Sequence, residues 1–162
     1  MRKIHLLTAI ILMLVSQACT NTPKENQKTE GWKAELEEKL PLLGHRNWIL
    51  IVDKAFPLQT GQGIEVIYTE EKLLPVLSHV LLEVEKADHV KPIVYTDKEL
   101  NYLNNTLVEG IDKYKDSLKQ TLPEKTESML HDSVFTNIKE ASQLFRVLVL
   151  KTDQTMAYSS VF

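Results

Sequence analysis

Hydrophobic residues follow two patterns along the chain, and each pattern predicts a different kind of element. Continuous runs of β-branched and aromatic residues favour strands that are covered on both faces, as in a parallel sheet between helices. Such a strand is predicted over Trp48–Val52. Further strands are predicted over Ile64–Tyr68, Ile93–Tyr95 and Arg146–Lys151, with a last strand over Met156–Phe162.

Apolar residues three or four positions apart predict helices, because that spacing places them on one helical face. Helices are predicted over Trp32–Leu43 and Val134–Phe145. Another is predicted to follow Thr69, with its buried face from Leu73 to Val84. A long helix is predicted to begin at a capping box, Thr96–Glu99, and to reach Leu118. Strands and helices therefore alternate, which implies a layered α/β domain with a mainly parallel sheet.

Two connections between these elements are also predicted. Pro123 breaks the chain, and Glu124–Glu127 is expected to be a polar crossing. Asp132 or Ser133 can cap the last helix, which would leave His131 just outside its N-terminus.

The first 18 residues have the composition of an export signal. Two basic residues precede the apolar stretch Ile4–Val15, and small residues lead to Cys19. The apolar stretch is shorter than the roughly 20 residues that span a bilayer. Cys19 stands where a bacterial lipoprotein is cleaved and acylated; ordinary cleavage after Ala18 is the alternative. Lipidation is the preferred interpretation because Cys19 is the only cysteine, and a free thiol there would be unexplained.

The following segment differs in composition from the rest of the chain. Thr20–Gly31 is polar, charged and without periodicity, so residues 19–31 are predicted to be a lipid-anchored linker and residues 32–162 one compact domain. Without Arg2 and Lys3, 17 basic residues face 22 acidic ones, a formal charge of −5. This charge argues against nucleic acid or an anionic membrane surface as a partner. Membrane attachment is expected only through the lipid, on the periplasmic or surface side.

Candidate site residues bracket the first strand. Gly44 and His45 form a turn before it, and Asp53 stands at its carboxyl end, where open α/β sheets collect ligands. The alternative interpretation is a surface turn and a strand-ending carboxylate. His79 and His89 lack the partner spacing of a zinc site, so no metal is expected.

Taken together, several short motifs resemble the D-ribose pyranase and L-fucose mutarotase family over about Leu36 to Phe162. They are Leu43-Gly44-His45, Asp53, Pro57, His131 with Lys139-Glu140-Ala141 downstream, and Tyr158. The resemblance implies a three-layer α/β/α fold with a mixed, mainly parallel sheet and a ring-shaped homo-oligomer. It also implies a cofactor-free reaction that opens and recloses the hemiacetal ring of a monosaccharide such as fucose or ribose.

The resemblance further implies roles for particular residues. His45 matches the catalytic histidine, while Asp53, His131 and Tyr158 match sugar-contacting positions. Ser160 stands where the family usually has Asn, so it is a fourth candidate contact. A histidine that titrates near neutral pH can move the protons that ring opening requires.

The first strand separates two of these residues. At roughly 3.3 Å per residue, an extended Asn47–Asp53 segment spans about 20 Å. His45 and Asp53 of one chain are then too far apart to contact one small sugar, so sites shared between subunits are predicted. Two functions remain open: a lipid-anchored sugar mutarotase, and a non-catalytic saccharide-binding or assembly protein.

Overall fold

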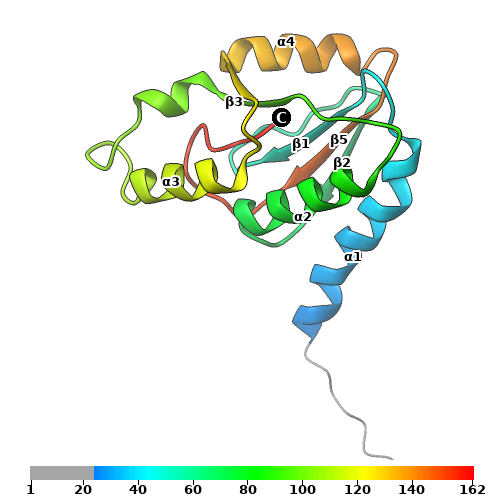
Figure 1. The fold of residues 1–162 in the computed structure, drawn as a ribbon, viewed down its shortest axis with the longest axis horizontal. Coiled ribbons are helices and arrows are strands. Elements are labelled where there is room, and N and C mark those ends of the chain that lie inside the picture. The colour runs from blue at the N-terminus through cyan, green and yellow to red at the C-terminus, as the bar shows by residue number, and fades with distance from the viewer. Residues whose placement is uncertain (1–23) are drawn as a thin grey trace, which may run out of the picture.

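The computed structural model describes residues 24–162, with side chains from residue 31 onward, and it confirms the α/β class (Figure 1). The helices are α1 (Lys24–Lys39), α2 (Leu73–Lys86), α3 (Ile111–Thr121) and α4 (His131–Ala141), with short 3-10 helices at η1 (Leu40–Leu42) and η2 (Lys98–Tyr102). The strands are β1 (Trp48–Val52), β2 (Ile64–Tyr68), β3 (Val94–Asp97), β4 (Thr126–Met129) and β5 (Val147–Lys151).

The strands form two parallel groups that the end of the chain joins. The first has the order β1-β5-β2, and the second pairs β3 with β4. Val161 forms antiparallel bridges with Ile51 of β1 and with Thr96 of β3. Phe162 adds two backbone hydrogen bonds to Tyr95, at 2.7 and 2.9 Å. The last two residues therefore lie between β1 and β3 and bring the carboxyl ends of these strands together.

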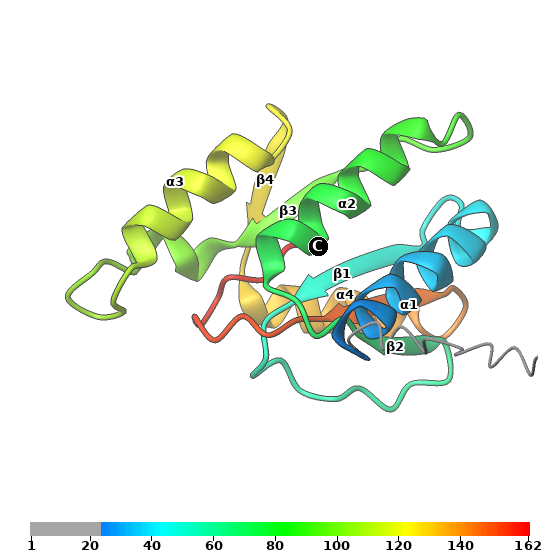
Figure 2. The same cartoon turned by 90° about the horizontal axis from the view of Figure 1, so that it is seen from below.

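Helices cover both faces of the β1-β5-β2 sheet, which confirms the three-layer arrangement. Alternate residues of β1 enter opposite cores: Ile51 packs with α1, α2 and α3, whereas Leu50 packs with α4. Figures 1 and 2 show α4 on one side of the strands and α1 and α2 on the other. Burial on both faces explains why β1 has no polar alternation.

Several predicted boundaries are wrong. The capping box at Thr96–Glu99 does not begin a long helix, because β3 runs to Asp97, η2 follows, and α3 begins only at Ile111. The expected polar crossing contains β4. The predicted last strand is limited to the bridges of Val161.

Two differences concern the ends of helices. His131 is the first residue of α4 and not a residue outside it, and the preceding Leu130 is its N-cap. At the other end of the domain, α1 begins at Lys24, so the part of the expected linker from Lys24 to Gly31 is helical. The predicted signal peptide and Cys19 lie outside the described residues. No helix among the described residues is long and apolar enough to cross a membrane.

Candidate functional site

Polar side chains gather where β1 and β3 end. Asp53 follows β1, Asp97 ends β3, and His131 begins the helix after β4. Because the last residues of the chain lie between β1 and β3, they add Tyr158 and Ser160 to the same place. The carboxyl-end cluster, as these five residues are called below, thus contains four residues that the sequence singled out and one, Asp97, that it did not.

Asp53 and Ser160 hold each other through two hydrogen bonds. The Ser160 hydroxyl donates to Asp53 Oδ2 at 2.9 Å and accepts from the Asp53 backbone N–H at 3.0 Å. Asp53 Oδ1 accepts from the backbone N–H groups of Ala55 and Phe56, at 2.9 and 3.1 Å. A serine hydroxyl has one hydrogen, and a carboxylate oxygen accepts about two bonds. The Ser160 donor is therefore used within the chain, while Oδ2 of Asp53 retains acceptor capacity.

His131 is oriented by a buried carboxylate. Its Nδ1 lies 2.8 Å from Asp97 Oδ1, and the Asp97 side chain is 0% exposed while that of His131 is 26% exposed. A carboxylate can only accept, so Nδ1 carries the hydrogen and Nε2 is the acceptor of the neutral ring. The backbone N–H of His131 donates to both Glu99 oxygens, at 3.1 and 3.2 Å. Glu99 thereby satisfies a free N–H at the positive end of α4.

The pKa of Asp97 reflects its burial. Removal from water raises the pKa of Asp97 above its ordinary value, and the hydrogen bond from His131 opposes this effect. The negative charges of Glu99 and Asp53 raise the pKa further. Asp97 Oδ2 is buried and has no hydrogen-bond partner among the described residues. Buried acceptors of this kind are usually satisfied by water or by a ligand, so Oδ2 is an available acceptor inside the cluster.

Tyr158 places an aromatic ring against His131, and its backbone has an uncommon conformation. Its ring lies edge to face with His131, with 5.2 Å between the ring centroids. Its φ of 56° is in the left-handed region, which costs a non-glycine residue about 1–3 kcal/mol and persists only where the surroundings impose it. The adjacent Ser159 is held by Tyr114, whose buried hydroxyl donates to the Ser159 carbonyl at 2.7 Å. Burial raises the pKa of Tyr114, so its hydroxyl stays protonated.

His45 lies apart from this cluster. It is exposed in the turn before β1, whereas Asp53 follows the other end of the strand. A pocket of about 790 Å³ opens beside it, lined by the turn, β1, α2, β3 and the loop from Asp88 to Ile93. One chain thus does not bring His45 and Asp53 to the same place.

Asp97 and Glu99 are the functional candidates that sequence reasoning missed. Both were interpreted as part of a helix cap, because Thr96-Asp97-Lys98-Glu99 has the spacing of a capping box. The structure uses them to hold His131, which lies 34 positions from Asp97 along the chain. The available signal was a carboxylate two residues after the predicted strand Ile93–Tyr95, similar to the feature that singled out Asp53.

Comparisons with known proteins identify the fold. No family model matches the sequence, and no curated protein matches it. Among solved structures, Bacillus subtilis RbsD complexed with D-ribose has 17% identity and a TM-score of 0.56, covering 79% of this chain and 88% of RbsD. FucU from Bifidobacterium longum has 15% identity and a TM-score of 0.51, covering 79% of this chain and 90% of FucU. The chain therefore has the α/β fold of RbsD and FucU, as its resemblance to the D-ribose pyranase and L-fucose mutarotase family implies.

Proposed function

We propose that this protein is a mutarotase that opens and recloses the hemiacetal ring of a monosaccharide. The observation that carries the proposal is the His131–Asp97 pair, set beside Asp53 and Tyr158 at the carboxyl ends of the strands. The RbsD structure with the same fold was solved as a complex with D-ribose, which supports a sugar as the ligand.

The chemistry needs a proton donor and a proton acceptor. Ring opening delivers a proton to the ring oxygen and removes one from the anomeric hydroxyl, and reclosure reverses both transfers. With Nδ1 bound to Asp97, the neutral ring of His131 offers Nε2 as an acceptor. Asp53 Oδ2 can accept a sugar hydroxyl, and the Tyr158 hydroxyl can donate to an oxygen.

The second proton-transfer group is proposed to come from another subunit. His45 is exposed at the amino end of β1, so it can complete a site only on a neighbouring chain. In this arrangement the neighbour's His45 serves as acid or base opposite His131 of the first chain. The assembly would be a homo-oligomer whose sites lie between subunits.

The test is saturation-transfer NMR of anomer exchange with fucose, ribose and galactose. Wild-type protein is expected to speed exchange of at least one sugar, and His45→Ala or His131→Asn to reduce the rate about 10²–10⁴-fold. Tyr158→Phe should also slow exchange. The matched control Tyr102→Phe, at an exposed tyrosine on η2, should not. Absence of exchange with every sugar would contradict the proposal.

Complementation tests the shared site. His45→Ala and Asp53→Ala chains should each be inactive, and co-assembled chains should recover up to about a quarter of wild-type activity, because random neighbours rebuild that share of the sites. No recovery in stable mixed oligomers would contradict sharing. Asp116→Asn, at an exposed carboxylate of α3, is the control for loss of a charge.

A non-catalytic saccharide-binding protein is the second candidate function. The observation that favours it is Ser160, whose only donor hydrogen is held by Asp53 and is unavailable to a sugar. Line broadening of a sugar without faster anomer exchange would support this candidate over the enzyme.

We also propose that the protein is exported and anchored to a bacterial membrane through a lipid on Cys19. The support is the basic and apolar order of residues 1–18 followed by the only cysteine. Mass spectrometry of the mature N-terminal peptide should show an acylated Cys19, and Cys19→Ser should release the protein from the membrane fraction. An unmodified Cys19 after cleavage at Ala18 would contradict the anchor.

A further inference from the structure

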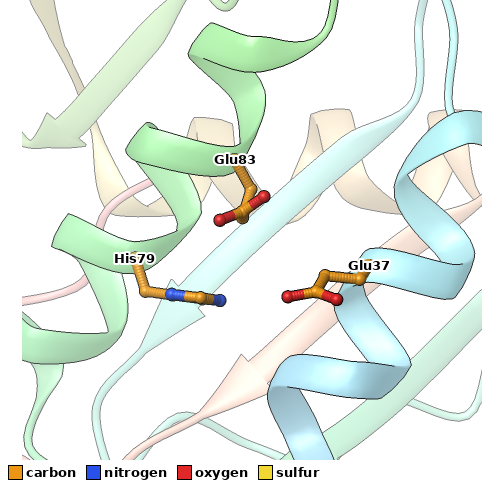
Figure 3. A group of neighbouring side chains, drawn as sticks. All are labelled: Glu37, His79 and Glu83. Atoms are coloured by element: carbon orange, nitrogen blue, oxygen red, sulfur yellow. The ribbon is translucent and has the colours of Figure 1, made fainter.

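A group of three metal-ligating side chains lies between α1 and α2, outside the carboxyl-end cluster. Glu37 comes from α1, and His79 and Glu83 come from α2. Figure 3 shows the Glu37 carboxylate opposite the His79 ring, with the Glu83 carboxylate turned toward the same gap. One ligand atom from each residue lies within 4.8 Å of the other two.

A second observation marks this gap as a binding site. His79 Nε2 is buried and has no hydrogen-bond partner among the described residues, although two carboxylates lie nearby. The edge-to-face packing of the His79 ring with the buried Trp32, at 5.2 Å between centroids, helps to hold the ring in place. A buried ring nitrogen that faces carboxylates without bonding to them is arranged as metal ligands are, with the cation between them.

The spacing also suits a metal ion. Three ligands at about 2.1 Å from a tetrahedral ion lie about 3.4 Å from one another. The three ligand atoms already lie within 4.8 Å of one another, so each pair has to approach by at most about 1.4 Å to reach that separation. His79 and Glu83 stand four residues apart on one helical face, which is a spacing that permits both to bind one ion.

The charged side chains around this gap are compatible with a bound metal ion. Lys86 binds one oxygen of Glu83 at 2.7 Å, and the carboxylate has a second oxygen for a metal. Two carboxylates that lie this close repel each other, and a cation removes the repulsion. One imidazole and two carboxylates, without a thiolate, form a donor set that binds Zn²⁺ and related divalent ions.

We propose that Glu37, His79 and Glu83 bind a divalent first-row transition metal such as Zn²⁺, which fastens α1 to α2. Sequence reasoning missed this site, because Glu37 lies on another helix and His79 has no ligand at zinc-finger spacing. Three protein ligands leave at least one coordination position for water.

Isothermal titration of the tag-free, chelator-treated full chain with Zn²⁺ tests the site. One ion should bind per chain, and Glu37→Gln, His79→Asn and Glu83→Gln should each weaken binding at least about tenfold. The matched controls are Glu38→Gln on α1 and Glu85→Gln on α2, which replace exposed glutamates of the same helices. Equal affinity in all five variants, or no binding by the wild type, would overturn the proposal.

Two further measurements distinguish loss of metal binding from misfolding of a variant. Zn²⁺ should slow amide hydrogen exchange in α1 of the wild type and not of Glu37→Gln, whose exposed side chain makes it the least disruptive change. Co²⁺ should give visible d–d absorption that His79→Asn alters. Exchange protection that Glu37→Gln retains would overturn the proposal.

Discussion

Replacing Ser160 by alanine tests how the carboxyl-end cluster is held together. The Ser160 side chain is fully buried and makes two hydrogen bonds, both with Asp53. The hydrogen bond to the Asp53 carboxylate has a charged acceptor, and such bonds contribute about 1.5–3 kcal/mol. The Asp53 backbone N–H would lose its partner, and a buried N–H without a partner costs about 1–3 kcal/mol. Because the two losses share one residue, they are expected to total about 3 kcal/mol.

The assay is urea unfolding at fixed protein concentration, followed by far-UV circular dichroism. With a slope of about 2 kcal/mol/M for a domain of this size, Ser160→Ala should lower the midpoint by about 1.5 M. Ser159→Ala is the matched control, because Ser159 makes one side-chain bond, to the Met156 carbonyl at 2.7 Å. Its midpoint should fall by about 0.5 M, the effect of losing one neutral bond.

The reasoning is refuted if the two alanine variants unfold at the same urea concentration. It is also refuted if Ser160→Ala costs as much in an Asp53→Asn background as in the wild type. A double-mutant cycle should instead show coupling of at least about 1 kcal/mol, because each side chain is the other's partner.

Three further predictions concern stability. Gly63→Ala should lower the free energy of unfolding by about 1–3 kcal/mol in thermal denaturation, because a Cβ there would lie 2.5 Å from the Phe145 carbonyl oxygen. Burial raises the pKa of Asp97 in the folded protein above its ordinary value of 3.8. Asp97 therefore contributes stability that is fully present below pH 3.8 and is lost as the pH rises through the folded-state pKa. In the Asp97→Asn variant the urea midpoint should fall less steeply as the pH rises through this range, and an unchanged pH dependence would refute this. Tyr114→Phe removes the donor to the Ser159 carbonyl and should cost about 1 kcal/mol in the same urea assay; no loss would contradict that bond's role.

The pattern of apolar residues was sufficient for most of the fold. β1, β2 and β5 lie where the sequence predicted strands. β1 and β5 are continuous apolar runs because they are buried on both faces, whereas β2, at the edge of the sheet, contains Glu65 and is only partly buried. α2 was also predicted, since one of its faces packs against the sheet. Elements without a buried face have weaker sequence signals: β4 has the sequence Thr-Glu-Ser-Met, and none of its residues is buried.

Single residues of the candidate site were predicted in part. Asp53 and His131 could be named from motifs, but Asp97 was interpreted as part of a helix cap, because local spacing cannot reveal a partner that is distant in sequence. The same limit hid the group formed by Glu37 and His79, whose members lie on different helices.

The sequence by itself determined the α/β class and the main buried strands, because hydrophobic periodicity is a local property of the chain. Only the tertiary structure decided which polar groups meet. It placed the last residues between β1 and β3, buried Asp97 beside His131, and left His45 at the opposite end of β1 from Asp53. These relations depend on contacts between segments far apart in sequence, and such contacts form only when the apolar faces pack around one core.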